Sequence, residues 1–545
     1  MTGLAQLRNI QTTSWEAAHA AFTWPEVADY NIATDCLSAP AEATALVVVG
    51  EDRSTSVSYG RLDDLSSRLA GVLHDLGVRV GDRVAVKLPQ SAEMAVAILG
   101  TLKLGAVVVT VSNVLGDDAV AHRLTDSTAR VLVCAGTPAE QQLADTCGTT
   151  LLSTREEGWL GGTLDVHEPL ASYPASGPND AAIILYTSGT TGSSKGVLHG
   201  HRVLLGHHAI DLAWDHIREG DVAYSPVDWS WGGGLLLGLL VPLAHGLTVV
   251  AFRDTRFDPE RTVDIMRETG VSVGLFPPTA LRVLQRSGAL TKETMAGLRL
   301  RALVTGAEAV EPELASWARD ELGLSVNNAF GQTEANALIG HARVLGELDE
   351  RSLGRPYPGH EVAVLDPDQQ PVDAGVVGEI AVRADDPVCM LRYWNAPEAT
   401  AAKFRNGWLL TGDSAHADRD GNLYFHGRAD DIIKSGGYRL GPAEIEGAIL
   451  AHPDVAECAV VGLPDPERGQ AVTAFVVLVQ GAQSSAELTK ELQTRVRSKV
   501  GAHAYPRRVE YVATLAKTTT GKIDRRALRR EPARVVQLKS EGGRA

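Results

Sequence analysis

A stretch rich in glycine and hydroxyl side chains, residues 186–196, carries the groups best suited to bind an anion. It follows an apolar run, residues 182–185, that predicts a buried strand, so the stretch exposes backbone N–H groups at a strand's end. Its donors and flexible backbone positions are Thr187, Ser188, Gly189, Thr190, Thr191, Gly192 and Lys195. We interpret it as a phosphate-binding loop, with a flexible surface turn as the alternative. It is not a P-loop, because Gly196 follows Lys195 where that motif needs Ser or Thr.

Further polar segments follow predicted strands in the same way. Residues 306–308 follow the apolar pair 303–304, residues 327–334 end in a carboxylate, and residues 408–413 end in Asp413. In open α/β sheets, ligands bind beyond the carboxyl ends of the strands, so the strand ends in the part of the chain up to Glu334 point to one crevice. Asp413 could cap a turn or accept hydrogen bonds from sugar hydroxyls.

Two tryptophans, Trp229 and Trp231, stand beside a run of glycines that begins at Gly232. Aromatic walls next to a backbone without side chains predict a pocket for a flat or apolar ligand. Burial of both tryptophans in an ordinary core is the alternative.

The last motif presents Lys522 in a Thr/Gly turn within residues 517–526. Such a lysine could be inserted into a site on another domain, whereas a solvated basic tail is the alternative. Before it, near Asp430, the chain changes to small α+β units. We therefore predict an N-terminal domain, residues 1–429, and a C-terminal domain, residues 430–545.

The elements that must position these groups alternate between helix-sized and strand-sized units, which favours an α/β fold with a mostly parallel sheet covered on both faces. Predicted helices span residues 59–76, 94–104, 203–212 and 234–244, and predicted strands span 83–88, 106–111, 131–134 and 247–252. Residues 135–176 are expected to be rich in loops. In the C-terminal part, a helix begins at Pro442, strands span 458–461 and 472–479, and a capping box from Ser484 to Glu487 starts another helix.

Composition excludes several classes of protein. A chain of 545 residues exceeds one core, and its net charge of −16 disfavours nucleic acid as a partner. The five cysteines are scattered without a C-x-x-C pair, which argues against a disulfide framework or a zinc site and fits a reducing compartment. No export signal is visible, so we expect a cytoplasmic protein. The apolar run 232–252 breaks at His245 into pieces too short to span a membrane.

Six motifs in one order resemble the acyl- and aryl-CoA synthetase branch of the adenylate-forming (ANL) superfamily. They lie at residues 186–196, 306–308, 330–334, 411–413, 427–439 and 520–522, and the likeness runs from about residue 56 to about residue 530. Residues 228–233 are most similar to short- and medium-chain acyl-CoA synthetases. The resemblance implies a large AMP-binding domain of mostly parallel sheets and a small mobile α+β domain. It also implies that ATP converts an acid to its acyl-adenylate with release of pyrophosphate, before transfer to CoA.

The resemblance also implies roles for individual residues. Residues 187–195 would hold the β- and γ-phosphates of ATP. The rest of the nucleotide and its Mg²⁺ would be bound by Gly306, Ala307, Glu308, Gln332, Thr333, Glu334, Asp413 and Arg428, with Thr333 at the α-phosphate and Glu334 on the metal.

For the mobile domain, the resemblance implies a hinge at Asp430 and a catalytic lysine, Lys522, that bridges the acid and the α-phosphate. Gly437 would line the pantetheine tunnel, and Arg439 would stay near the phosphate or the acyl-adenylate. Positioned cations suit this chemistry because negative charge accumulates as a carboxylate attacks the α-phosphate.

Two residues depart from the family pattern. Ser194 replaces the usual proline before the loop lysine, which should loosen that turn. Gly331 stands where acetate-selective relatives have a tryptophan that closes the acyl pocket. We therefore expect a medium-chain or aromatic acid, with Trp229, Trp231, Gly232 and Gly331 lining the pocket.

Other functions share these motifs. Some relatives load a carrier protein, and others activate nitrite to diazotise an arylamine, so the acid and the acceptor stay open. A nucleotide-binding pseudoenzyme conflicts with the presence of Lys522, Glu334 and Asp413. The oligomeric state also stays open, with a homodimer among the alternatives.

Overall fold

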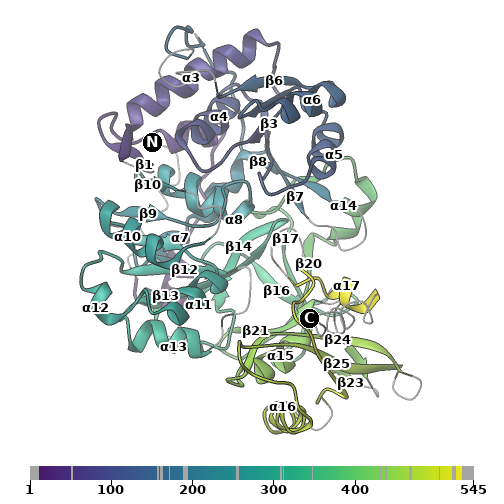
Figure 1. Ribbon diagram of the computed structural model, residues 1–545. Helices are drawn as coiled ribbons and strands as arrows, with labels where there is room; N and C mark the ends of the chain where they lie inside the picture. Colours follow the sequence, from purple (N-terminus) through teal and green to yellow (C-terminus); the bar gives the residue numbers. More distant parts are fainter. Residues whose placement is uncertain are drawn as a thin grey trace. The chain divides into compact units, whose positions relative to one another are not determined.

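The computed structural model describes residues 12–530 except 51–52, 156–158, 160–163, 171, 188–193, 253–256, 307–309, 311, 347, 429–430, 432, 436–437, 466–468, 502–503 and 518–522. The chain divides into two compact units (Figure 1). Unit one comprises Met1–Thr187, Ser194–Val362 and Val382–Leu409, and unit two comprises Ser188–Ser193, Ala363–Ala381 and Leu410–Ala545. Asp430, the predicted hinge, lies outside the described residues.

The first sheet of unit one contains the two strands, β7 and β8, that flank the predicted phosphate-binding loop in the sequence. Among the described residues its strand order is β18 (Arg392–Tyr393), β8 (Lys195–Gly200), β7 (Ala181–Thr187), β4 (Val107–Thr110), β3 (Arg83–Lys87), β5 (Val131–Cys134) and β6 (Thr150–Ser153). The strands from β7 to β6 run parallel, whereas β8 and β18 add an antiparallel edge. Four-residue strands such as β4 and β5 are buried along their whole length, as expected where helices cover both faces.

The second sheet of unit one carries the turn that ends in Glu334. In the described part of the chain its order is β15 (Arg355–Pro356), β14 (Ala335–Gly340), β13 (Ser325–Gln332), β12 (Ala302–Gly306), β11 (Val273–Leu275), β9 (Val222–Tyr224), β10 (Thr248–Ala251), β1 (Thr44–Val49) and β2 (Ser54–Ser58). It too is parallel in the middle and antiparallel at both edges. The expectation of a mostly parallel α/β fold is therefore confirmed.

Helices α3 (Tyr59–Asp75) and α4 (Ala92–Lys103) pack against each other beside the first sheet (Figure 1). Their apolar residues, including Leu62, Leu69 and Ile98, are fully buried in the largest core cluster, which also takes residues from both sheets. The other helical segments of unit one are α1 (Trp15–Ala21), α2 (Ile32–Cys36), α5 (Asp117–Ser127), α10 (Pro259–Thr269), α11 (Pro278–Ser287), α12 (Lys292–Met295), α13 (Pro312–Asp320), η5 (Arg343–Leu345) and α14 (Pro397–Lys403).

Two expectations about unit one need correction. Residues 135–176 are not simply loop, because they include β6 and helix α6 (Pro138–Cys147), which has a capping box between Thr137 and Glu140. Residues 203–212 do not form one helix but short pieces, η2 (His201–Val203), η3 (Leu205–His207) and α7 (Ile210–Ala213). Within this stretch, a Cβ on Gly206 would lie 2.2 Å from Val388 Cγ1, so the packing requires glycine, a residue that disfavours a continuous helix.

The apolar run 232–252 folds into short core elements, as predicted. These are α8 (Gly232–Leu235), the π-helical turn η4 (Leu236–Leu240), α9 (Val241–Ala244) and β10. Nowhere in the described chain does a helix have both the length and the apolar character needed to cross a membrane.

Unit two contains strands and helices of the predicted small α+β type. Its described strands are β16 (Val362–Leu365), β17 (Gly378–Arg383), β20 (Trp408–Ala417), β21 (Leu423–Arg428), β22 (Ile433–Ser435), β23 (Tyr438–Leu440), β24 (Val455–Asp465), β25 (Gly469–Leu478) and β26 (Arg508–Tyr511). Its helices are α15 (Pro442–Leu450), α16 (Ala486–Lys499) and α17 (Arg525–Arg530). Pro442 begins α15, as predicted.

The predicted capping box between Ser484 and Glu487 is wrong, because helix α16 begins one residue later. The N-cap is Ser485 rather than Ser484, and its Oγ accepts a hydrogen bond from the backbone N–H of Leu488 at 3.0 Å. Adjacent serines offer two equivalent capping positions, and the helix uses the one that buries Leu488, Leu492 and Val496.

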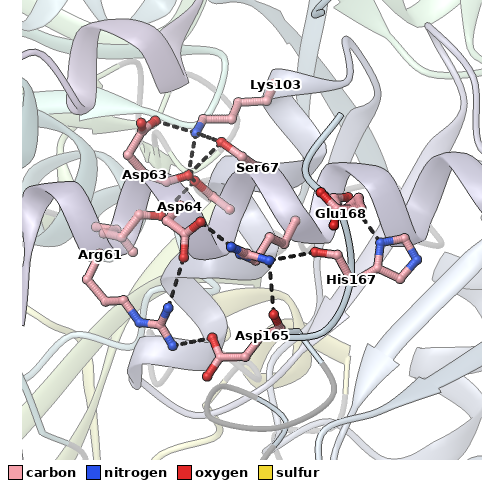
Figure 2. A network of polar contacts seen from close by, with 11 residues as sticks. Arg61, Asp63, Asp64, Ser67, Lys103, Asp165, His167 and Glu168 are labelled. Atoms are coloured by element: carbon pink, nitrogen blue, oxygen red, sulfur yellow. Dashed lines mark hydrogen bonds and ion pairs between the residues drawn. The ribbon is translucent and has the colours of Figure 1, made fainter. Parts of the chain in front are cut away.

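A polar network joins α3 and α4 to the segment around Asp165 and His167 (Figure 2). Lys103, only 5% exposed, donates to the backbone oxygen of Asp63 at 2.8 Å and to Ser67 Oγ at 2.8 Å, and it contacts the Asp63 carboxylate. Burial lowers the pKa of Lys103, and the hydrogen bond to Asp63 opposes this effect. On the neighbouring turn, Arg61 bridges Asp64 and Asp165.

Lys103 should stabilise unit one mainly by packing, because the carboxylate of Asp63 is more than half exposed and stays hydrated without it. We expect Lys103→Met to change the free energy of unfolding by about 1 kcal/mol or less. Lys103→Ala should lower it by about 2–4 kcal/mol, because it leaves a cavity. Denaturant titration of both variants measures the difference, and an equal loss in both would show that the ammonium hydrogen bonds dominate.

Candidate active site

The predicted phosphate-binding loop lies between two paired strands. Thr187 ends β7 and Lys195 begins β8, and these two residues are directly opposite each other in the antiparallel register. Ser188, Gly189, Thr190, Thr191 and Gly192 lie outside the described residues. The described stems thus bring Thr187 and Lys195 together, as a loop between adjacent strands requires.

Helix α5 contacts the chain on both sides of this loop. Nε2 of His122 donates to the backbone oxygen of Ser194 at 2.9 Å, and the Tyr186 hydroxyl donates to Asp126 Oδ2 at 2.6 Å. Because His122 and Asp126 are four residues apart on one helix, they share a face. Burial, reinforced by Asp126, raises the pKa of Tyr186 and keeps its hydroxyl protonated. The turn that lacks the usual proline at Ser194 is therefore held by a side chain from α5.

Lys195 and Glu334 contact the same tyrosine. The Tyr393 hydroxyl donates to Glu334 Oε1 at 2.5 Å, and Lys195 Nζ lies 5.5 Å from the centre of the Tyr393 ring. Tyr393 reaches this place because β18 pairs with β8, which puts Tyr393 opposite Val197. The tyrosine orients the carboxylate and holds the ammonium group nearby.

The backbone of the turn before Glu334 is held by several groups. His199, on β8, donates from Nε2 to the backbone oxygen of Thr333 at 2.7 Å, and Met390 N donates to the backbone oxygen of Glu334 at 2.8 Å. Burial lowers the pKa of His199 to about 4, so the ring is neutral near pH 7. Lys403 Nζ lies 3.3 Å from Gln332 Oε1. These contacts thus hold the predicted residues Gln332, Thr333 and Glu334 in place.

The donors at this turn suit a hard cation. Glu334 offers a carboxylate and Thr333 a hydroxyl, the oxygen donors that Mg²⁺ prefers. Within the described part of the chain, no group of three or more His, Cys, Asp or Glu side chains could hold a metal by itself. Such a donor set fits a Mg²⁺ ion that takes most of its ligands from phosphates and water.

The second predicted strand end is described only in part. Gly306 ends β12, whereas Ala307 and Glu308 lie outside the described residues. A Cβ on Gly306 would lie 2.3 Å from the backbone oxygen of Ala329 on the neighbouring strand β13, so this position needs glycine. Adjacent strands β12 and β13 run parallel, and their carboxyl ends lead into residues 306–308 and 332–334 at the same edge of the sheet, as predicted.

The residues predicted to line the acyl pocket differ in how far they are exposed. Trp229 is completely buried in the main core, as the core interpretation predicts, whereas Trp231 and Gly232 are partly exposed. A Cβ on Gly331 would lie 2.3 Å from the backbone nitrogen of Ala337, so the close approach of β14 requires glycine here. The role of Gly331 in the acyl pocket stays a prediction.

Asp413 and Arg428 belong to unit two and face each other across the β20–β21 hairpin. The Arg428 guanidinium lies 3.3 Å from Asp413 Oδ1, and the Asp413 carboxylate is 8% exposed. Thr411 supports the turn, because its hydroxyl accepts from the Asp413 N–H at 3.1 Å. Gly412 adopts a φ of +78° beside Arg428, a conformation that favours glycine.

The remaining predicted residues are described in part or not at all. The backbone of Arg439 lies in β23, opposite Lys434 of β22. Asp430, Gly437 and Lys522 lie outside the described residues. Their predicted roles stay predictions.

Comparison with known proteins identifies the class. Residues 34–394 match the family model of the AMP-binding enzyme, and residues 444–522 match that of the AMP-binding enzyme C-terminal domain. The chain belongs to the AMP-binding enzyme family, within the acyl/aryl-CoA synthetase branch of the adenylate-forming superfamily. It is an AMP-forming acid–CoA ligase, which uses ATP, a small-molecule acid and CoA.

Three relatives illustrate the likeness. An uncharacterized acyl-CoA ligase of Bacillus subtilis, YtcI, is 31% identical over 94% of this chain and 97% of its own length. The mitochondrial acyl-coenzyme A synthetase ACSM4 of Rattus norvegicus is 33% identical over 90% of this chain and 87% of its own. The crystal structure of a benzoate CoA ligase from Burkholderia xenovorans LB400 superposes with a TM-score of 0.81 at 28% identity, covering 92% of this chain and 100% of that one.

Sequence patterns did not point to several residues that hold this site. Tyr393, His199, His122 and Asp126 stand outside the glycine-rich motifs, and their partners are distant in the chain. Only His199 had a local signal, because it shares one face of β8 with Lys195 through the two-residue period of a strand.

Tyr393→Phe should weaken the response to Mg²⁺ and ATP while leaving the protein folded. The variant loses the hydrogen bond to Glu334 but keeps the ring beside Lys195, so we expect kcat/KM for ATP to fall about 10-fold. Pyrophosphate release measured across a range of Mg²⁺ concentrations gives this value. Tyr173→Phe, which changes a partly exposed tyrosine of the same unit, is the matched control. An unchanged Mg²⁺ dependence would show that Tyr393 does not position Glu334.

Proposed function

We propose that this acid–CoA ligase activates a medium-chain or aromatic carboxylic acid, with the residues of the six motifs in the roles that the family resemblance implies. The observation that carries the assignment of roles is the contact of Tyr393 with both Glu334 and Lys195. It brings an anion-binding cation and a metal-binding carboxylate to one place, which phosphate chemistry requires.

The proposed chemistry has two steps. A carboxylate oxygen of the acid attacks the α-phosphorus of ATP, the bond to the pyrophosphate oxygen breaks, and a mixed anhydride with AMP forms. The thiol of CoA then attacks the acyl carbon, and AMP leaves with the oxygen that the acid supplied. Lys195 stabilises the charge of the leaving pyrophosphate, and Lys522 stabilises the charge between the acid and the α-phosphate.

A Mg²⁺ ion bound at Glu334 would supply charge neutralisation at the phosphates. The protein's own part is to hold Glu334 through Tyr393, and Thr333 through His199. In unit two, Asp413 accepts hydrogen bonds from the ribose hydroxyls, and Arg428 orients its carboxylate.

The proposed class of acid substrate is inferred from the loop between Asp228 and Gly234. Trp231 offers an aromatic face that is partly exposed, and Gly232 at the start of α8 adds no side chain. The loop is held by Asp228, whose carboxylate accepts from Ser230 N at 2.9 Å and from Ser112 Oγ at 2.9 Å. The benzoate CoA ligase named above is a relative that acts on an aromatic acid, which supports the same class.

Residues 430–545 would rotate as the mobile domain about Asp430, and the protein would work in the cytoplasm. All five cysteines are free, four of them buried, which suits a reducing compartment. A homodimer is also proposed, and light scattering of the purified protein measures its oligomeric state.

The proposed function is tested by ATP turnover, with pyrophosphate detection, over a panel of fatty acids, aryl acids and nitrite. Each is offered with CoA, with an arylamine or without an acceptor. We expect turnover with medium-chain or aryl acids, and acyl-CoA as the product when CoA is present. Turnover confined to nitrite with the arylamine would contradict the proposal and favour a diazotase.

Lys522→Ala separates the two steps. We expect adenylate formation to fall at least about 100-fold, because a cation at the α-phosphate is lost. Consumption of supplied acyl-adenylate with CoA should be retained. Lys517→Ala is the control, since Lys517 belongs to the same sequence motif and is paired with Glu457 at 2.9 Å. Equal loss of both steps would remove Lys522 from the proposed role.

A further inference from the structure

The loop between β9 and α8 follows a strand of the second sheet but is held by hydroxyl groups from the first sheet. Thr110, the last residue of β4, donates from its hydroxyl to the backbone oxygen of Ser230 at 2.7 Å. Ser112, two residues farther along the chain, donates to Asp228 Oδ2 at 2.9 Å. Two hydroxyl groups at the carboxyl end of β4 thus hold the residues just before Trp231.

These contacts fix the backbone of Trp231 on both sides. The peptide group that joins Ser230 to Trp231 is bonded at its oxygen by Thr110, and its N–H donates to the backbone oxygen of Asp228 at 3.0 Å. The carbonyl oxygen of Trp231 accepts from Leu235 N at 2.8 Å. Asp228 Oδ1 also accepts from the N–H of Ser230 at 2.9 Å and from its hydroxyl at 2.5 Å. The direction in which the Trp231 side chain leaves the loop is therefore set by Thr110 and Asp228.

A glutamine that follows β3 holds the earlier part of the same loop. Nε2 of Gln90 donates to the backbone oxygens of Ser225 and Val227, at 3.1 Å each. Ser225 donates in turn from its hydroxyl to the backbone oxygen of Leu275, at the end of β11, at 2.8 Å. Residues at the carboxyl ends of β3 and β4 therefore support one loop of the other sheet.

The hydroxyl groups of this network are buried, so each depends on its partner. Thr110, Ser112 and Ser230 are 4%, 2% and 5% exposed. Removal of the Thr110 hydroxyl leaves the Ser230 oxygen without that donor, and an unpaired buried acceptor is costly. The loop recovers a donor only by moving, and the backbone of Trp231 moves with it.

We propose that Thr110 and Ser112 are positioning residues that set the affinity for the acid by fixing Trp231. The inference rests on the proposed function, in which Trp231 lines the acid pocket. Trp231 is partly exposed, and residues 232–234 are glycines without side chains. The placement of the Trp231 ring therefore decides how much of the apolar part of an acid is covered.

The consequence is selective for the acid over ATP. Lys195 and Glu334 are held by Tyr393 on β18, a contact in which the two hydroxyl groups take no part. A shift of the loop should therefore weaken binding of the acid and leave binding of the nucleotide unchanged. If the hydroxyl groups only stabilised unit one, the affinities for both substrates would fall together.

The test uses the full-length protein with Thr110→Val and, separately, Ser112→Ala, each of which removes one hydroxyl group. Initial rates of pyrophosphate release give KM for ATP and KM for benzoate and octanoate, as an aryl and a medium-chain acid. Thr149→Val is the matched control, because Thr149 is a buried threonine of unit one whose hydroxyl donates to the backbone oxygen of Ala129 at 3.0 Å. Thr110→Ser keeps the hydroxyl group and should behave like the wild type.

We expect KM for the acid to rise about 10-fold in Thr110→Val and in Ser112→Ala, with kcat and KM for ATP within about twofold of wild type, because uniform binding of the acid is lost. Thr149→Val and Thr110→Ser should keep the wild-type KM for the acid. An unchanged KM for the acid in both variants, or an equal rise in KM for ATP, would overturn the inference.

Absence of acid-dependent pyrophosphate release by the wild-type protein would instead overturn the proposed function, so the two failures are distinguishable. Thermal melting of each variant identifies one that has lost its fold, in which case the other variant decides.

Discussion

The pairing of β18 with β8 is the constraint on which the anion-binding end of unit one depends. This two-residue strand, contributed by a distant part of the chain, adds itself to the edge of the first sheet just beyond Lys195. Its tyrosine then contacts Lys195 with its ring and Glu334 with its hydroxyl. A short stretch of backbone pairing thereby fixes the separation of a cation and a carboxylate, and such preorganisation is how enzymes stabilise charge that develops during reaction.

Unit two positions its charged groups through ion pairs between side chains. The β20–β21 hairpin places Arg428 beside Asp413, and α17 uses two arginines to hold Asp431 and Glu446. The carboxylates of Asp413, Asp431 and Glu446 are largely buried, and an unpaired buried charge is costly. The units therefore arrange their charged groups by different means, backbone pairing and a neutral histidine in one and buried ion pairs in the other.

Local patterns were enough to predict the class of fold and many elements. The apolar period of residues 59–76 corresponds to α3, and residues 131–134 correspond to β5. Local patterns failed where distant contacts decide the outcome. At Gly206 and at Gly331, another part of the structure approaches the backbone too closely for a Cβ, and the local sequence reveals neither approach. Tyr393 could not be assigned from the sequence, because nothing in its local pattern reveals a partner at Glu334.

Adenylate formation depends on a new bond between a carboxylate oxygen of the acid and the α-phosphorus of ATP. The most direct measurement uses an acid whose carboxylate carries ¹⁸O, with turnover in the presence of CoA and mass analysis of all phosphorus products. With both carboxylate oxygens labelled, each AMP released should carry one labelled oxygen and pyrophosphate should carry none. AMP without label, or label in inorganic phosphate or pyrophosphate, would contradict adenylate formation.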